Sequence, residues 1–249
     1  MLYVSALFVS CLVTLFLGRY AWIRRDIPAA KSVAAMMMGI SWWTLCYAVQ
    51  LMRGAFPDVI PQPDTLPLFW FRLMFIGVGV LPASFLTFVL QYTGVMDRIR
   101  PRLVLLLSII PTLVVVVALT DGPYHDWFLA GFTAAPGQTF AGGAVFWLHA
   151  LYSYLVTLIA YGYLIRFIIR SRVYRTQAVI LLFGGLASSV ANLLTITGAL
   201  PDSLQGLDIS PFGFLITAIV MLLNVRSHGF LDVMPIARSL VFEHMADGV

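Results

Sequence analysis

Apolar residues follow one another in long runs along most of this chain, with short polar stretches between them. A helix rising about 1.5 Å per residue needs roughly twenty apolar residues to cross a hydrocarbon core about 30 Å thick. Seven such runs are Leu2–Ile23, Ser32–Met52, Leu66–Tyr92, Leu103–Thr120, Ala144–Ile169, Gln177–Leu200 and Pro211–Val225. The pattern predicts an all-α membrane protein built as a bundle of seven transmembrane helices.

The third run is the one around which the rest is expected to be organised. It places Arg72 about two turns inside one end of the helix. An arginine inside a membrane costs about 2.5–3.5 kcal/mol on insertion scales and is a candidate functional residue by default. Gly77, Gly79 and Pro82 follow near the middle of the run, where they predict a weak point in the helix.

Prolines punctuate several of the predicted helices. Pro82 and Pro111 each remove a backbone donor and free a carbonyl one turn back, at Val78 and Leu107. For Pro82, a static kink and a hinge are both open interpretations.

Two other prolines mark the starts of helices. Pro101 opens the fourth helix, and Ser210 followed by Pro211 predicts the N-cap and first turn of the seventh.

The charged residues predict which way the helices cross the membrane. Only 10% of the residues are charged, against about 25% in soluble domains, which indicates an integral membrane protein. In membrane proteins, positively charged residues are enriched in the cytoplasmic loops. With the N-terminus outside, thirteen of the fifteen basic residues are cytoplasmic: Arg19, Arg24, Arg25, Lys31, Arg98, Arg100, Arg102, Arg166, Arg170, Arg172, Arg175, Arg226 and Arg238. Six acids fall in the outer loops, namely Asp58, Asp64, Asp121, Asp126, Asp202 and Asp208. The C-terminus is therefore expected in the cytoplasm.

The first apolar run is expected to remain as a helix rather than to be cleaved as a signal peptide. It lacks a basic region before it, and its first positive charge, Arg19, comes near its end. The two cysteines, Cys11 and Cys46, lie inside apolar runs, where they are predicted to be small buried hydrophobic residues. A disulfide or a metal pair is the alternative.

Polar side chains in hydrocarbon need partners, so they mark the interior of a bundle. Several polar and aromatic residues fall within about 5–15 Å of the outer surface, counted along the predicted helices. The ligand-binding candidates are Arg72, His149, Asn192, Trp70, Trp147, Tyr152 and Gln50. Their common depth predicts an outward-facing cavity that is mostly apolar and carries a few fixed polar groups.

Each of the three central candidates also has a purely structural interpretation. Arg72 pairs with an outer-loop acid such as Asp126 or Asp208 in that case, and an acid-bearing ligand is the functional alternative. His149 is then a hydrogen-bonded core histidine. Asn192 is then an interhelical contact, worth about 0.6 kcal/mol.

The long outer loop between the fourth and fifth helices carries His125, Asp126 and Trp127. Together with Asp208 from the last outer loop, His125 and Asp126 are candidates for a lid over the cavity. The alternative is an aromatic anchor at the membrane interface.

No catalytic constellation can be drawn from the sequence. It offers no glycine-rich phosphate loop and no metal-spaced His/Cys cluster, so the chain as given is not expected to be an enzyme, and neither a cofactor nor a nucleic-acid partner is predicted. His244 beside Glu243 suggests a phosphoacceptor, but nothing in the chain is suited to bind ATP. The single lysine, Lys31, lies in a cytoplasmic loop, which excludes a retinal Schiff base in the seventh helix.

Five segments are distinctive in their order and spacing: LFWFRLMFIGVGVLPASFLTFVLQYTG, PTLVVVVALTDGPYHDWF, FWLHALYSYLV, YRTQAVILLFGGLASSVANLL and GLDISPFGFLITAIVMLLNVRSHGFLDVMPIARSLVFEHMADGV. Together they resemble the seven-helix N-terminal sensor region of bacterial sensor histidine kinases. The best-matching positions are Phe69, Trp70, Arg72, Pro82, Tyr92, Thr93, Gly94, His125, Trp147, His149, Tyr152, Asn192, Asp208 and Pro211. The resemblance implies a multi-pass protein of the bacterial inner membrane that acts in two-component signalling.

The resemblance also implies a division of the chain. Residues 1–227 are expected to form the sensor domain and residues 228–249 a cytoplasmic connector helix, capped by Asp232. In the family, a similar segment leads into a PAS domain and then a kinase or, in some members, a diguanylate cyclase.

The resulting hypothesis is a receptor. A small or amphipathic ligand binds in the cavity, and a helix shift through Pro82, Pro211 and Asp232 reaches a cytoplasmic histidine kinase in a homodimer. The alternatives are a small-solute transporter or channel, the sensor of a diguanylate cyclase, and a scaffold module.

Overall fold

The computed structural model describes residues 2–27, 29–55, 65–122, 124–132, 140–172, 174–201, 204 and 207–217. Its elements are α1 (Leu2–Ile23), α2 (Ala30–Ala55), α3 (Thr65–Leu73), α4 (Phe75–Tyr92), α5 (Pro101–Thr120), β1 (Leu129–Phe132), β2 (Phe140–Gly142), α6 (Ala144–Arg170) and α7 (Arg175–Thr197). Residues 210–217 form a further helical stretch, here called the C-terminal segment. The remainder of the predicted seventh helix, the 227/228 boundary and Asp232 lie outside the described residues.

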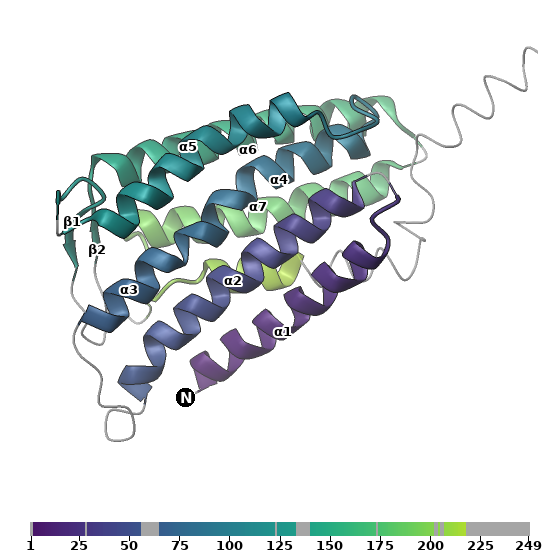
Figure 1. Ribbon diagram of the computed structural model, residues 1–249. Helices are drawn as coiled ribbons and strands as arrows, with labels where there is room; N and C mark the ends of the chain where they lie inside the picture. The colour runs from purple at the N-terminus through teal and green to yellow at the C-terminus, as the bar shows by residue number, and fades with distance from the viewer. Residues whose placement is uncertain are drawn as a thin grey trace, which may run out of the picture.

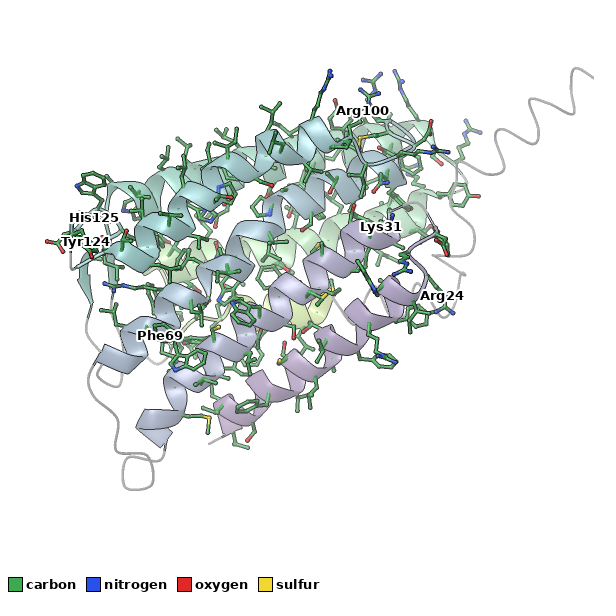
Figure 2. All side chains as sticks on the ribbon, viewed as in Figure 1. Arg24, Lys31, Phe69, Arg100, Tyr124 and His125 are labelled. Atoms are coloured by element: carbon green, nitrogen blue, oxygen red, sulfur yellow. The ribbon has the colours of Figure 1, made fainter. Side chains whose placement is uncertain are left out.

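The helices lie side by side and run alternately up and down in one bundle (Figure 1). Strands β1 and β2 pair antiparallel at one end, the hairpin end, where Phe69, Tyr124 and His125 also lie (Figure 2). Arg24, Lys31 and Arg100 lie at the opposite end, the basic end (Figure 2). The bundle thus separates its charges as the sequence predicts.

Six helices of the described residues are long and apolar enough to cross a membrane. They are Leu2–Ile23, Ala30–Met52, Leu68–Tyr92, Pro101–Thr120, Ala144–Arg170 and Arg175–Thr197. They match the first six predicted runs closely, and the first matches at both ends. The prediction of an all-α membrane protein is confirmed at this level.

Helices α2 and α4 form the centre of the bundle. Gly39 and Gly77 let their backbones touch, because a Cβ on Gly77 would lie 2.4 Å from the Gly39 carbonyl oxygen. Gly79 similarly meets Pro111 of α5, at 3.0 Å from a built Cβ. These glycines are therefore close-packing positions, as small residues often are between membrane helices.

The third predicted helix is interrupted at Met74, nearer its start than the weak point expected around Gly77–Pro82. The Gly77 N–H donates to the Met74 carbonyl at 2.9 Å, one residue short of the α-helical partner. This leaves the Leu73 carbonyl free, and the Trp42 indole N–H donates to it at 3.0 Å. An indole from α2 thus stabilises the junction between α3 and α4.

The C-terminal segment begins differently from the prediction. Asp208 caps it, because the Ser210 backbone N–H donates to Asp208 Oδ1 at 2.9 Å. Ser210 lies inside the first turn with Pro211, and its hydroxyl oxygen accepts a bond from α7 instead. The Ser210 hydroxyl is engaged by Asn192 Nδ2 of α7, so the Asp208 side chain takes the capping role.

Candidate functional site

A cavity of about 430 Å³ lies between α2, α4, α6, α7 and the C-terminal segment, with Phe71 of α3 also in its wall. Aromatic rings form much of the wall, namely Trp43, Phe71, Phe75, Phe85, Phe146 and Phe214. Polar side chains also line it, among them Tyr47, Gln50, His149, Ser153, Tyr154, Tyr161, Ser188, Ser189, Asn192, Thr195, Asp208 and Thr217. This size and mixture are typical of small-molecule sites.

His149 is the most distinctive polar group in the wall. Its side chain is 3% exposed, and its Nδ1 lies 2.8 Å from the hydroxyl oxygen of Ser153, one turn along α6. Its Nε2 is buried and has no hydrogen-bond partner among the described residues. A buried polar atom without a partner costs about 1–3 kcal/mol, so Nε2 of His149 is a candidate contact for a group in the cavity.

Asn192 connects three elements at the cavity wall. The Tyr154 hydroxyl of α6 donates to Asn192 Oδ1 at 2.9 Å, and Asn192 Nδ2 donates to the Ser210 hydroxyl oxygen at 3.1 Å. Deeper in the bundle, the hydroxyls of Ser188 and Thr217 lie 2.7 Å apart. The amide of Asn192 therefore serves as an interhelical contact and lines the cavity as well.

The start of the C-terminal segment is held from three helices. The Tyr3 hydroxyl of α1 donates to the Asp208 carbonyl, and the Asp208 N–H donates to the Tyr47 hydroxyl oxygen of α2 at 2.8 Å. From α7, the Thr195 hydroxyl oxygen accepts the Ile209 N–H at 3.3 Å. Tyr47, Thr195 and Asp208 also line the cavity. These three residues therefore belong both to the cavity wall and to the contacts that hold the start of the C-terminal segment.

Asp208 is the carboxyl group of the described lining. Burial raises the pKa of this group, and hydrogen bonds from Ser210 and Thr195 partly oppose the rise. The local environment therefore favours the neutral form of Asp208 more than water does.

Arg72 does not line the cavity and is turned to the hairpin-end loop. Its Nη2 lies 4.0 Å from Oδ2 of Asp121, a carboxylate that is 2% exposed. The sequence had offered Asp126 or Asp208 as partners; the pair forms with Asp121 because that residue ends α5 beside α3. Arg72 therefore lies apart from His149 and Asn192, which do line the cavity.

Asp121 organises the loop that carries the predicted lid residues. Oδ1 accepts the Phe128 N–H at 2.9 Å and lies 3.2 Å from His125 Nδ1, while Oδ2 accepts the Leu129 N–H at 3.1 Å. His125 stacks on Trp127, with ring centroids 4.7 Å apart. His125 and the exposed Asp126 thus belong to a fixed turn whose described side chains are outside the cavity lining.

Phe128 connects this loop to the cavity wall. Its side chain is fully buried, and its ring packs on Phe75 and Phe146 at centroid distances of 4.7 and 6.0 Å. Phe75 and Phe146 line the cavity. The hairpin-end loop therefore covers the rings that form one wall of the cavity.

Of the other candidates, Gln50 lines the cavity and Trp70, Trp147 and Tyr152 do not. Trp147 is 47% exposed on the outside of α6. The Tyr152 hydroxyl donates to the Leu107 carbonyl at 2.5 Å, the same carbonyl that Pro111 frees in α5. Tyr152 thus supplies the donor that Pro111 cannot give to this carbonyl. It can do so because its side chain lies on the face of α6 that is turned toward α5.

Asp121, Ser153 and Trp43 are the residues that the sequence did not single out as candidates. The i, i+4 spacing of His149 and Ser153 was a usable signal, since such residues lie on one helical face. The pairing of Asp121 with Arg72 carried no local signal, because these two residues lie far apart in the sequence.

A family model described as the N-terminal 7TM region of histidine kinase matches residues 6–235. The chain belongs to this family. The predicted resemblance is thereby confirmed over most of the sequence. No curated protein matches the chain, and no solved structure does.

Membership of the family defines the general class of protein to which this 7TM region belongs. It is a multi-pass membrane protein region associated by family with histidine kinases. Its described residues contain no group of three or more His, Cys, Asp or Glu side chains able to hold a metal ion. Within this 7TM region, the structure shows a cavity and hydrogen bonds that connect its wall to the C-terminal segment.

Proposed function

We propose that this 7TM region is the sensory domain of a bacterial signal-transduction protein, and that a small molecule in the cavity is its signal. The observation that carries the proposal is the double role of Tyr47, Asn192 and Thr195. They line the cavity and also bind residues 208–210, where the C-terminal segment begins. A ligand that displaces these side chains acts directly on that segment.

The coupling follows from simple thermodynamics. A ligand shifts a conformational equilibrium only by its different affinities for the two states. If the segment moves relative to α7, the Asn192–Ser210 and Ser188–Thr217 contacts change, and the shape of the cavity changes with them. The shift then passes along the chain to a PAS and histidine kinase module, in a homodimer. Pro82 in the wall and Pro211 in the segment are the candidate hinges.

The proposed orientation places the hairpin end outside the bacterial inner membrane and the basic end in the cytoplasm. Tyr124 and His125, which flank Asp126 and follow Asp121 in the sequence, lie at the hairpin end, while Arg24, Lys31 and Arg100 lie at the other (Figure 2). The asymmetry supports this orientation through the preference of positive charge for the cytoplasmic side. The signal then enters from the periplasm or the outer leaflet.

A cavity-filling substitution tests the proposal in the full-length protein. Ala150 lines the cavity, whereas its neighbour Leu151 is 58% exposed on the outside of α6. Ala150→Phe is expected to change autophosphorylation in reconstituted membranes at least several-fold, and Leu151→Phe is expected to leave it unchanged. Equal, unchanged output from both variants would count against the proposal, and solute flux into proteoliposomes would favour a transporter instead.

A further inference from the structure

We infer that the molecule sensed in the cavity is uncharged, mostly apolar, and carries a hydroxyl group that hydrogen-bonds to Nε2 of His149. This inference rests on the proposed sensory function and specifies its ligand class. It depends on a buried polar atom of the wall, Nε2 of His149, that has no hydrogen-bond partner among the described residues, on the charges around the cavity, and on the aromatic character of the wall.

The hydroxyl follows from the state of the imidazole. Nδ1 is engaged with the Ser153 hydroxyl at 2.8 Å, and Nε2 is buried without a partner. A hydroxyl in the cavity both donates and accepts, so it pairs with Nε2 in either tautomer. The Val78 carbonyl of α4 is a second acceptor for the ligand hydroxyl. Pro82 has no N–H to donate to this carbonyl, and both residues line the cavity.

The absence of charge follows from the ionisable groups around the site. No lysine or arginine is among the described residues of the lining. The cation closest in sequence to the wall, Arg72, faces Asp121 instead. An anionic ligand would therefore be buried with no lysine or arginine of the described lining beside it and in the same cavity as the Asp208 carboxyl, which disfavours its binding.

A cationic ligand is disfavoured for a related reason. Asp208 Oδ1 already accepts the Ser210 N–H and caps the C-terminal segment. Ser210 and Thr195 also hydrogen-bond to the Asp208 carboxyl through their side chains, so an ammonium group would compete with these donors for its oxygens. The remaining wall consists largely of rings and aliphatic groups, such as Trp43, Phe146 and Phe214, which favour an apolar body.

Photoaffinity labelling with three matched probes tests the inference. The probes are a diazirine-bearing medium-chain alcohol and the carboxylic acid and primary amine of the same chain, added to the complete protein in phosphatidylcholine nanodiscs. Labelled sites are mapped by mass spectrometry. The alcohol is expected to label cavity residues and to be displaced by the unlabelled alcohol, while the acid and the amine label mainly lipid-facing residues.

Variants at His149 give the decisive comparison. His149→Phe keeps an aromatic ring without the ring nitrogens and is expected to lower cavity labelling by the alcohol about 5–10-fold, the value of one buried hydrogen bond. His149→Gln retains a donor and an acceptor and is expected to keep most of the labelling. Trp147→Phe, on the outside of the same helix, is the control and should change nothing.

The outcomes separate the ligand class from the sensory role. Cavity labelling by the acid or the amine equal to that by the alcohol overturns the inference and leaves the proposed function standing. Unchanged alcohol labelling in His149→Phe, or no cavity labelling by the alcohol, also overturns it. The proposed function fails independently, if Ala150→Phe leaves the output of the full-length protein unaltered.

Discussion

Asp121 and Arg72 illustrate how single residues are used in this bundle. Asp121 is buried, and its two oxygens accept two backbone N–H groups from the turn that follows α5. Arg72 adds a charge at 4.0 Å without entering the cavity. The intramembrane arginine is thus explained by the loop it stabilises, because a buried carboxylate needs a compensating charge.

Replacing Asp121 is the most direct test of this arrangement. Asp121→Ala leaves the N–H groups of Phe128 and Leu129 and the charge of Arg72 without their partner. We expect the free energy of unfolding to fall by about 2–4 kcal/mol, measured by thermal unfolding in detergent. Asp126→Ala, an exposed change in the same turn, should stay within about 0.5 kcal/mol. Equal effects at the two sites would refute the assigned role.

The raised pKa of Asp208 predicts that the stability of the folded protein depends on pH. Its pKa is raised in the folded protein by burial, so its stabilising contribution is complete below the pKa of an unfolded aspartate, about 3.9, and is lost as the pH rises through the folded value. Asp208→Asn cannot ionise and keeps an oxygen for the Ser210 N–H. We expect the stability of the variant relative to the wild type to increase from pH 4 toward neutrality, measured by melting temperature; parallel curves would contradict this.

At the residue scale, the depth of a side chain along its helix placed some of the candidates at the cavity but not others. His149, Asn192 and Gln50 do line one cavity, as their common depth suggested. Trp147 and Tyr152 share that depth but lie on other faces of α6. The depth of a residue follows from its position along the helix. Which face of the helix points to the bundle interior depends on the neighbouring helices, and the position along the helix carries no information about them.

At the scale of elements, glycine decides how closely α2 and α4 approach each other. The sequence suggested that Gly77 and Gly79 make the third helix pliable. In the structure Gly77 touches the Gly39 backbone and Gly79 touches Pro111. Small residues serve the same purpose where Gly213 of the C-terminal segment meets Ser188 of α7.

A pair of glycine substitutions separates packing from intrinsic helix preference. Gly77→Ala would place a Cβ 2.4 Å from the Gly39 carbonyl oxygen, so α2 and α4 must move apart. We expect a loss of about 1–3 kcal/mol, typical of overpacking. Gly162→Ala meets nothing within 4 Å and should be neutral or stabilising by about 0.5–1 kcal/mol. Unfolding in detergent measures both, and a neutral Gly77→Ala would show that the contact is dispensable.

At the scale of the whole molecule, the bundle is polarised along its axis. The exposed Tyr124 lies at the hairpin end, and Arg24, Lys31 and Arg100 lie at the basic end (Figure 2). Interfacial aromatics and positive charges position multi-pass proteins in the membrane. The proposed orientation is therefore a property of the complete bundle.

Cysteine labelling tests that orientation. Tyr124→Cys at the hairpin end is expected to react with a membrane-impermeant maleimide on bacterial cells whose outer membrane has been permeabilised. Arg100→Cys at the basic end should react only after the inner membrane is opened. The native Cys11 and Cys46 are buried and should contribute little background. Labelling of Arg100→Cys alone in the first condition would reverse the orientation.

The sequence by itself determined the apolar helices, their alternating direction, the charge polarity and the family, because each depends on local composition or on order along the chain. Only the tertiary structure decided that Arg72 lies beside Asp121, that Met74 interrupts the third helix, and that Nε2 of His149 is left without a partner among the residues the structure describes. These features depend on how helices rotate and how closely they approach. Contacts such as Gly39 with Gly77 set that geometry, and they join residues too distant in sequence for a local pattern to reveal.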